Sequence, residues 1–564
     1  MAIEERVDSS LCSGFDSGRS SLRLWLGALL TLAVVALGLM MRLWLVFHRP
    51  LTGDEAIVGL MAHQLLHGQM FTFYWGQAYG GVEPYLVAAW TVAVGPSPVA
   101  LNSVPVVLSA ATALVVWRVC RRIVPADVRF LAMSAGLATW VWPDVLIFNS
   151  TTELGFRGAA LLAGVLLLLF ALRTAQSAAT LDLLLLGLVA GIGWWASPEI
   201  IYFVVVAACI LGAGWSSLRR ARAKLLLVPV AAVIGAAPWI ATNLQTGFLS
   251  LRISSSPAYN QSGYPGRLGI FFDKSLPMML GLRLPLRGNW LWGSAGKGLY
   301  VLAAIVLAVG CLTALVGIGH NERHGYVRAL GMGVLAFPFI FAAFPATSFW
   351  AQGQYGLYFV PLAVLMLAGV SGEICDVGRR DSDGRRLSTT RIIMLGVAVV
   401  GLVASLGNSL VSFDRAWLGS PSRFFNDWSG PSQIARSVTA QLTANGVRTA
   451  YANYWVAYDL DYLSHEHLKV TDPYADRWVA GLHLVRRSTD PAWLFFAPSQ
   501  IAAAQDAFVS TTPGPWTFSE ISFMARLHGL GIHYRIEHVG VIDALIPDRT
   551  VTPAEVGIPS PFWP

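Results

Sequence analysis

Eleven apolar stretches constrain the fold of this chain more than any other feature of its sequence. Each is long enough to form a helix that crosses about 30 Å of hydrocarbon. They lie at residues 24–47, 98–118, 127–147, 155–173, 180–196, 198–214, 224–241, 298–318, 327–345, 354–374 and 391–411. Only 13% of the 564 residues are charged, against about 25% in soluble domains. We therefore predict a polytopic α-helical membrane protein with about eleven transmembrane helices. A soluble enzyme, a fibrous protein and a disordered chain are excluded.

The basic residues between the stretches predict which side of the membrane each loop occupies. With residues 1–23 as a cytoplasmic tail, every basic cluster between two spans falls in a cytoplasmic loop, as the positive-inside rule requires. The clusters consist of Arg118, Arg121, Arg122, Arg129, Arg173, Arg219, Arg220, Arg222, Lys224, Arg323, Arg328, Arg379, Arg380, Arg385, Arg386 and Arg391. Because topology explains where these cations lie, the formal net charge of +7 gives no reason to expect a nucleic-acid partner.

Residues 85–95 form a further apolar stretch, which is too short to cross the membrane. Counting it as a span would place the later basic clusters outside, so we expect an interfacial or re-entrant helix there. The transmembrane domain then covers residues 24–411, with large external loops at 48–97 and 242–297.

Residues 412–564 show alternating helix and strand patterns in place of long apolar stretches. We expect helices at 432–444, 500–509 and 519–530, and strands at 447–454, 492–497 and 533–542. The tail is therefore predicted to be a small extracytoplasmic α/β domain.

The external loop at 48–97 carries the acidic residues that most suggest a reaction centre. Asp54 and Glu55 open an amphipathic helix just outside the first span, and Glu83 lies near the far end of the loop. Glu55 has a structural alternative, because Thr52 and Glu55 fit the T-x-x-E capping box. Glu83 could likewise cap the short helix that follows it. Adjacent helix residues point about 100° apart, so Asp54 and Glu55 are not expected to face one reacting centre.

Together these features resemble the GT-C superfamily of polyprenyl-phosphate-sugar-dependent glycosyltransferases. The resemblance rests on the acid pair, the segment GQAYGGVE at 76–83, the GWWASP run at 193–198, and Pro238 and Trp239 followed by Asn243. The branch that the chain resembles most contains the protein O-mannosyltransferases and the lipid A aminoarabinose transferases, with the bacterial members called family 39 proteins. The eleven-span plan and the external tail agree with this resemblance.

The resemblance implies an inverting transfer, in which an acceptor hydroxyl attacks the anomeric carbon of a sugar carried on a polyprenyl phosphate. It implies Asp54 as the general base and Glu83 as the matching acid at the end of the loop. Glu55, Gln77 and Tyr79 would support them. The aminoarabinose branch carries Lys where this chain has Pro84, so the aminoarabinose substrate is not expected.

Glu153 and Arg157 lie in the next external turn and are predicted to join the same site. Related transferases carry a second acid here, and Arg157 is a candidate for the donor phosphate. The alternative is an ordinary helix pair, since the two residues are four apart. Arg283 and Arg287, in the loop at 242–297, are further phosphate candidates, although contact with lipid headgroups would also explain them.

The expected partners are a polyprenyl-phosphate-linked sugar, a cell-envelope acceptor and membrane lipids, in the plasma membrane of a bacterium. No cofactor and no metal site are predicted, while the need for a divalent cation, the sugar and the acceptor stay open. A transporter or flippase is the alternative function, but it should show ionisable groups near the midplane and paired, interrupted helices. A membrane scaffold would not need Asp54 or Glu83.

The predicted topology can be tested with single cysteines in a cysteine-free variant. Cysteines at Ser256 and Ser510 should react with a membrane-impermeant maleimide from outside, because both positions lie in predicted external segments, whereas a cysteine at Ser382 should not. The measurement is labelling of intact cells, with permeabilised cells as the control. Labelling at Ser382 together with protection at Ser256 would mean that residues 85–95 span the membrane.

Overall fold

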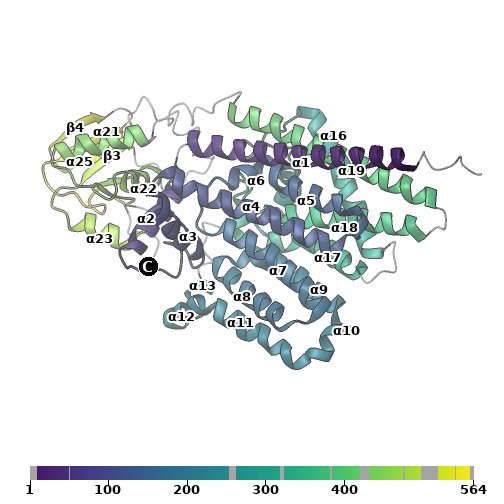
Figure 1. The fold of residues 1–564 in the computed structure, drawn as a ribbon. Helices are drawn as coiled ribbons and strands as arrows, with labels where there is room; N and C mark the ends of the chain where they lie inside the picture. The colour runs from purple at the N-terminus through teal and green to yellow at the C-terminus, as the bar shows by residue number, and fades with distance from the viewer. Residues whose placement is uncertain are drawn as a thin grey trace, which may run out of the picture.

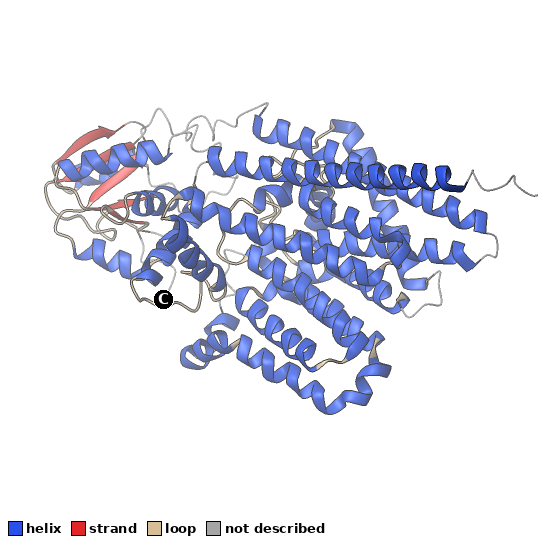
Figure 2. Cartoon of the chain, in the orientation of Figure 1, coloured by secondary structure: helices blue, strands red, loops and turns tan. Residues whose placement is uncertain are grey.

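The computed structural model divides into a bundle of helices and a smaller α/β unit at one end of it (Figure 1). It describes residues 9–49, 51–252, 262–317, 323–380, 384–418, 431–473, 477–496, 519–539 and 542–558. The expected helix at 500–509 and the labelling positions Ser256, Ser382 and Ser510 lie outside these residues. Strands are confined to the α/β unit (Figure 2).

Seven described helices are long and apolar enough to cross a membrane. They are α1 (Ser9–His48), α4 (Pro98–Ile123), α7 (Arg157–Ser177), α16 (Gly293–Val316), α17 (His324–Ala343), α18 (Phe359–Arg380) and α19 (Gly384–Phe413). The segments Pro198–Ala213 and Trp215–Gly235 would count as an eighth span, bent by 69°. The polytopic helical fold is therefore confirmed, while the count of eleven stays a prediction.

The other expected spans also contain helices, but several are short or interrupted. The stretch at 127–147 was expected to be one helix, and this is wrong, because it divides into α5 (Arg129–Val141) and α6 (Asp144–Asn149). Pro143 lies at the break, where a residue without an N–H and with a bulky ring cannot continue the helix. The remaining apolar stretches hold α8 (Thr180–Ala196), α9 (Ile201–Ala213), α11 (Leu227–Gly235) and α12 (Ala237–Thr246). Shorter helices are α10 (Trp215–Leu218), α13 (Leu249–Arg252), α14 (Tyr264–Ile270) and α15 (Leu276–Met279).

Two helices of the loop at 48–97 lie between the bundle and the α/β unit (Figure 1). α2 (Gly53–Leu66) is buried over most of its length, so it belongs to the interior of the protein rather than to its surface. α3 (Val82–Val94) is the short helix expected at 85–95, and its 13 residues are fewer than a bilayer crossing requires.

The α/β unit is built on a five-stranded mixed sheet with the order β2-β1-β3-β5-β4. The strands are β1 (Thr449–Ala452), β2 (Lys469–Thr471), β3 (Ala492–Phe496), β4 (Tyr534–Val539) and β5 (Ile542–Pro547). β1 pairs in parallel with β2 and β3, whereas β5 runs antiparallel to β3 and β4. The helices are α21 (Pro431–Ala444), α22 (Tyr454–Leu463), α23 (Val479–Arg487) and α25 (Glu520–Gly529). The expected alternation of helices and strands is thus observed.

Two strands of the tail were placed wrongly by sequence pattern. The strand expected at 447–454 stops at Ala452, and Tyr454 begins α22 instead. The aromatic residues of α22 recur at a spacing of three to four, which is the helical period that the strand interpretation overlooked. The strand expected at 533–542 is a pair of strands, because the chain turns back between Val539 and Ile542.

α22 packs directly on α2 and joins the tail to the acidic loop. A shared apolar cluster contains Tyr454, Tyr458 and Trp478 of the tail together with buried side chains of α2. The two helices approach closely at Gly59, where an added Cβ would lie 2.3 Å from Cε2 of Tyr462. A side chain at position 59 would therefore push α22 away from α2.

Replacing Gly59 with alanine should destabilise the contact between α2 and α22. Alanine favours a helix by about 1 kcal/mol over glycine, but overpacking against Tyr462 costs about 1–3 kcal/mol. The matched control is Gly401→Ala in α19, where an added Cβ meets nothing within 4 Å. Thermal unfolding in detergent should give a lower melting temperature for Gly59→Ala and no loss for Gly401→Ala. Equal melting temperatures for the two variants would contradict the packing argument.

Candidate active site

Glu55 is fully buried at the start of α2 and is held by the capping box and by an arginine. Its Oε2 accepts hydrogen bonds from the N–H and the hydroxyl of Thr52, both at 2.8 Å. The guanidinium of Arg49 donates to both carboxylate oxygens and also to the carbonyl oxygen of Thr151, the last at 2.8 Å. These bonds join the end of α1, the start of α2 and the turn after α6. The geometry favours the structural alternative for Glu55.

Asp54 is partly exposed and contacts the tail. The hydroxyl of Tyr454 donates a hydrogen bond to Oδ1 of Asp54 at 2.5 Å. The hydroxyl of Tyr74 donates to the backbone carbonyl of Asp54 at 2.9 Å. Neighbouring residues of a helix point about 100° apart. Glu55 therefore points inward to Arg49, whereas Asp54 faces the boundary between the loop and the tail.

Glu83 and Glu153 form a buried carboxyl pair behind the acidic loop. Glu83 is 1% exposed, and its Oε1 accepts from the backbone N–H of Ala159 in the first turn of α7 at 2.5 Å. Glu83 therefore caps α7 and not its own helix. Glu153 is fully buried, and its Oε1 accepts from the N–H of Gly155 at 2.9 Å. Burial, and then the charge of Glu83, raise the pKa of Glu153 well above its ordinary value of 4.5.

Arg157 begins α7 beside this pair, among aromatic rings. Its guanidinium carbon lies 4.6 Å from the ring centroid of Phe156 and 5.3 Å from that of Tyr355. Within the described part of the chain, Nε of Arg157 is buried and has no hydrogen-bond partner. Arg157 thus keeps a donor available at a helix N-terminus, which is a favourable place for an anion.

The two supporting residues of the GQAYGGVE segment lie in a compact turn of the same loop. The backbone N–H of Gln77 donates to the carbonyl of Tyr74 at 2.9 Å. The backbone N–H of Tyr74 donates to the carbonyl of Tyr79. The ring of Tyr79 meets that of Phe156 edge to face, with centroids 4.9 Å apart. Tyr79 therefore connects the acidic loop with the turn that carries Glu153 and Arg157.

Sequence reasoning missed Glu199, which lies in the short turn Pro198–Ile200. Glu199 is buried, and its Oε2 accepts from the hydroxyl of Tyr358 at 2.7 Å. Ser197 caps this turn by accepting from the backbone N–H of Glu199 at 3.2 Å. Arg157 interacts electrostatically with Glu199. The GWWASP run ends one residue before Glu199, so the serine cap followed by proline was the available signal.

Arg283 and Arg287 lie in a separate loop that follows α15. Nη1 of Arg283 donates to the carbonyl of Gly288 at 2.8 Å, and its Nη2 to Asp273 at 3.3 Å, while its guanidinium lies 4.4 Å from the ring of Trp290. Nη1 of Arg287 donates to the carbonyl of Arg415 at 3.3 Å. Arg283 is thus engaged in holding its own loop, which weakens its case as a phosphate ligand relative to Arg157.

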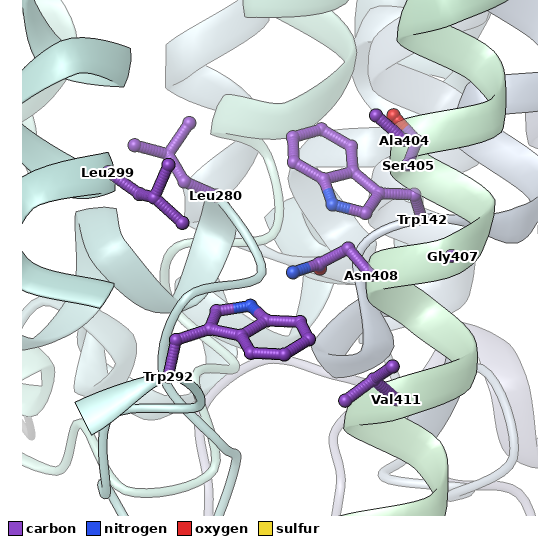
Figure 3. Close-up of a pocket in the computed structure, with 9 residues that line it drawn as sticks. All are labelled: Trp142, Leu280, Trp292, Leu299, Ala404, Ser405, Gly407, Asn408 and Val411. Atoms are coloured by element: carbon purple, nitrogen blue, oxygen red, sulfur yellow. The ribbon is translucent and has the colours of Figure 1, made fainter. Parts of the chain in front are cut away.

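An apolar groove of about 550 Å³ lies next to this loop, between α16 and α19 (Figure 3). Trp142 and Trp292 face each other across Asn408, whose Oδ1 is buried without a hydrogen-bond partner among the described residues. The lining is completed by Leu280, Leu299, Ala404, Ser405, Gly407 and Val411. None of these residues was predicted as part of the site.

The described elements define a polytopic membrane protein with buried acids at the end of its bundle and an α/β tail packed against them. No family model matches the sequence, and no curated protein matches it. The chain is similar in structure to ArnT from Cupriavidus metallidurans bound to undecaprenyl phosphate, with a TM-score of 0.56, 13% identity, and coverage of 91% of this chain and 97% of that one. The apo state of the same ArnT gives a TM-score of 0.55 and 12% identity, with coverage of 92% of this chain and 98% of that one.

A lower similarity exists to the archaeal oligosaccharyltransferase AglB from Archaeoglobus fulgidus, with a TM-score of 0.45, 11% identity, and coverage of 93% of this chain and 77% of that one. The similarity to ArnT extends over nearly the whole of both chains. The chain therefore shares the fold of ArnT.

Replacing Glu153 with glutamine should change how stability depends on pH. Since the pKa of Glu153 is raised from 4.5, the folded protein keeps a proton that the unfolded chain loses, and stability falls as pH rises above 4.5. Glutamine cannot ionise, so Glu153→Gln should melt about 2 °C or more above the parent at pH 8, and the gap should shrink at pH 5.

The control for this experiment is Glu555→Gln. Backbone hydrogen bonding from Thr552 lowers the pKa of Glu555, so its removal should give no gain at pH 8. A melting temperature of Glu153→Gln that tracks the parent at every pH would show that Glu153 is ionised in the folded protein.

Proposed function

We propose that this protein is an inverting glycosyltransferase that moves a sugar from a polyprenyl-phosphate donor to a hydroxyl of a cell-envelope acceptor. The reaction takes place at the outer face of a bacterial plasma membrane, with the N-terminus in the cytoplasm. The observation that carries this proposal is that acids from two loops far apart in the sequence come together. Glu153 interacts with Glu83 and with Glu55, and Glu55 is adjacent to Asp54. Arg49 bonds both Glu55 and Thr151, which are close in sequence to Asp54 and Glu153 respectively.

The similarity to ArnT supports the choice of donor. The structure of that protein contains bound undecaprenyl phosphate, and its fold matches 91% of the present chain. The position of α2 and α3 between the bundle and the α/β unit (Figure 1) supports a reaction there between a water-soluble acceptor and a membrane-borne donor. A transporter would instead need ionisable groups that line a path through the bundle.

The proposed roles follow from the different surroundings of the three acids. Asp54 is the one with exposed surface, so it can reach an acceptor hydroxyl and take its proton. The hydroxyl oxygen then attacks the anomeric carbon, the bond from that carbon to the phosphate oxygen breaks, and polyprenyl phosphate leaves with the bonding electrons. Glu83 and Glu153 are buried and orient the donor from behind. Arg157 is the cation for the phosphate, because its Nε is unpartnered among the described residues.

The test is to incubate purified protein with a panel of radiolabelled polyprenyl-phosphate sugars and to measure which donor is consumed. Asp54→Asn should lower turnover of that donor about 100-fold to 10,000-fold, because positioned proton transfer is lost. Its melting temperature should stay close to the parent's, since the amide oxygen of asparagine can still accept from Tyr454.

Two comparison variants separate catalysis from folding. Asp548→Asn changes an exposed carboxylate of the tail and should leave both turnover and melting unchanged. Glu55→Gln should lower the melting temperature, because it weakens the buried pair with Arg49. Turnover by Asp54→Asn within about threefold of the parent would remove Asp54 from the role of base, since the loss expected for a base is far larger.

A further inference from the structure

Tyr454 brings a side chain of the tail into direct contact with the proposed base. It is the first residue of α22 and is 6% exposed. Its hydroxyl donates to Oδ1 of Asp54 at 2.5 Å, across 400 positions of sequence. Hydrogen bonds to an ionised carboxylate are shorter and stronger than neutral ones. The contact therefore fixes one oxygen of Asp54 in space.

The surroundings of Tyr454 hold its ring and keep its hydroxyl a donor. The ring packs edge to face on Tyr458, with centroids 5.2 Å apart. The guanidinium carbon of Arg477 lies 5.7 Å from the ring of Tyr454 and 5.9 Å from that of Tyr74, and Tyr74 bonds the backbone of Asp54. Burial raises the pKa of Tyr454 well above its ordinary value, so the phenol keeps its proton throughout the working pH range.

Two further contacts hold the tail against α2 and the acidic loop. Trp75 of the acidic loop stacks on Trp478 of the tail, with centroids 4.9 Å apart and planes 4° apart. At the other end of α2, Glu466 accepts hydrogen bonds from Gln64 at 2.8 and 2.9 Å and lies 2.5 Å from Nδ1 of His63. These contacts hold the tail against the acidic loop and so keep α22 next to Asp54.

We propose that Tyr454 is a positioning residue of the transfer reaction, so that the tail completes the active site instead of merely covering it. Tyr454 holds Oδ1 of Asp54 and thereby turns Oδ2 toward the acceptor. The acceptor proton passes to Oδ2, and Tyr454 keeps its own proton throughout. This inference rests on the proposed function, because it assigns the base to Asp54.

Tyr454→Phe removes the hydroxyl and keeps the ring. The KM for donor and acceptor should stay that of the parent, because Tyr454 contacts Asp54 and is not proposed to contact either substrate. The value of kcat should fall about tenfold, since the carboxylate is less well oriented. Other charged or titratable groups face this contact and stay unchanged in the variant. They are Arg49, Glu55, Tyr74, Tyr458, Asp459, Asp472 and Arg477.

The matched control is Tyr462→Phe, which changes a tyrosine on the same helix. The ring of Tyr462 packs over Gly59, and nothing described in the structure connects its hydroxyl with Asp54. Its kcat and KM should equal those of the parent. A second variant carries a fluorinated tyrosine at position 454, which keeps the hydroxyl and makes it a stronger donor. This variant should keep the kcat of the parent, and it also serves if Tyr454→Phe fails to fold.

Thermal unfolding tests the contact without any assay of activity. A double-mutant cycle compares Asp54→Ala, Tyr454→Phe and the double variant. The double variant should lose less in melting temperature than the sum of the two single losses, because each single variant already breaks the same hydrogen bond. Additive losses would overturn the proposal. A parental kcat for Tyr454→Phe, in a protein that consumes donor, would overturn it as well. A parent that consumes none of the donors, with coupled melting temperatures, would overturn the proposed function and leave the contact established.

Discussion

The buried pair of Arg49 and Glu55 is the interaction on which the arrangement of the site depends. Two buried charges are costly unless their remaining donors and acceptors are satisfied. Here Thr52 supplies two hydrogen bonds to the carboxylate, and the carbonyl of Thr151 accepts from the arginine. One polar contact therefore fixes the end of α1, the direction of α2 and the turn that leads to Glu153. The adjacent helix position is what gives Asp54 its freedom to face outward.

The acids of the site differ in their surroundings more than in their chemistry. The carboxylate of Glu83 accepts a hydrogen bond at the N-terminus of α7, and Glu153 lies beside it and is fully buried. Asp54 keeps exposed surface and meets a phenol from the tail. Carboxyl groups placed in such different environments can take different roles in one reaction. Arg157, which lies over the ring of Tyr355, and Glu199, which accepts from Tyr358, extend this polar interior.

Local sequence signals predicted most of the helices and part of the site. Long apolar runs locate the membrane helices, and the T-x-x-E pattern locates the start of α2, because both depend on neighbours in the chain. Pro143 marks the break between α5 and α6, and a proline is visible in the sequence alone. The bond between Tyr454 and Asp54 joins residues 400 positions apart, and no local pattern encodes it. Glu199 was missed because it follows a recognised motif instead of lying in it. The role of Arg283 stays a prediction, and its hydrogen bond to Gly288 depends on the folding of its loop, which no local pattern encodes.

The missing side chain at position 59 has a consequence for how such chains can be recombined. α2 accepts the ring of Tyr462 because Gly59 leaves room for it, and Trp75 is stacked on one particular tryptophan of the tail. The tail is thus complementary in shape to residues 51–80. A chimera that exchanges tails between related chains should retain its fold only when this loop is exchanged with the tail. The segment that must be exchanged as a unit therefore crosses the boundary between the two domains.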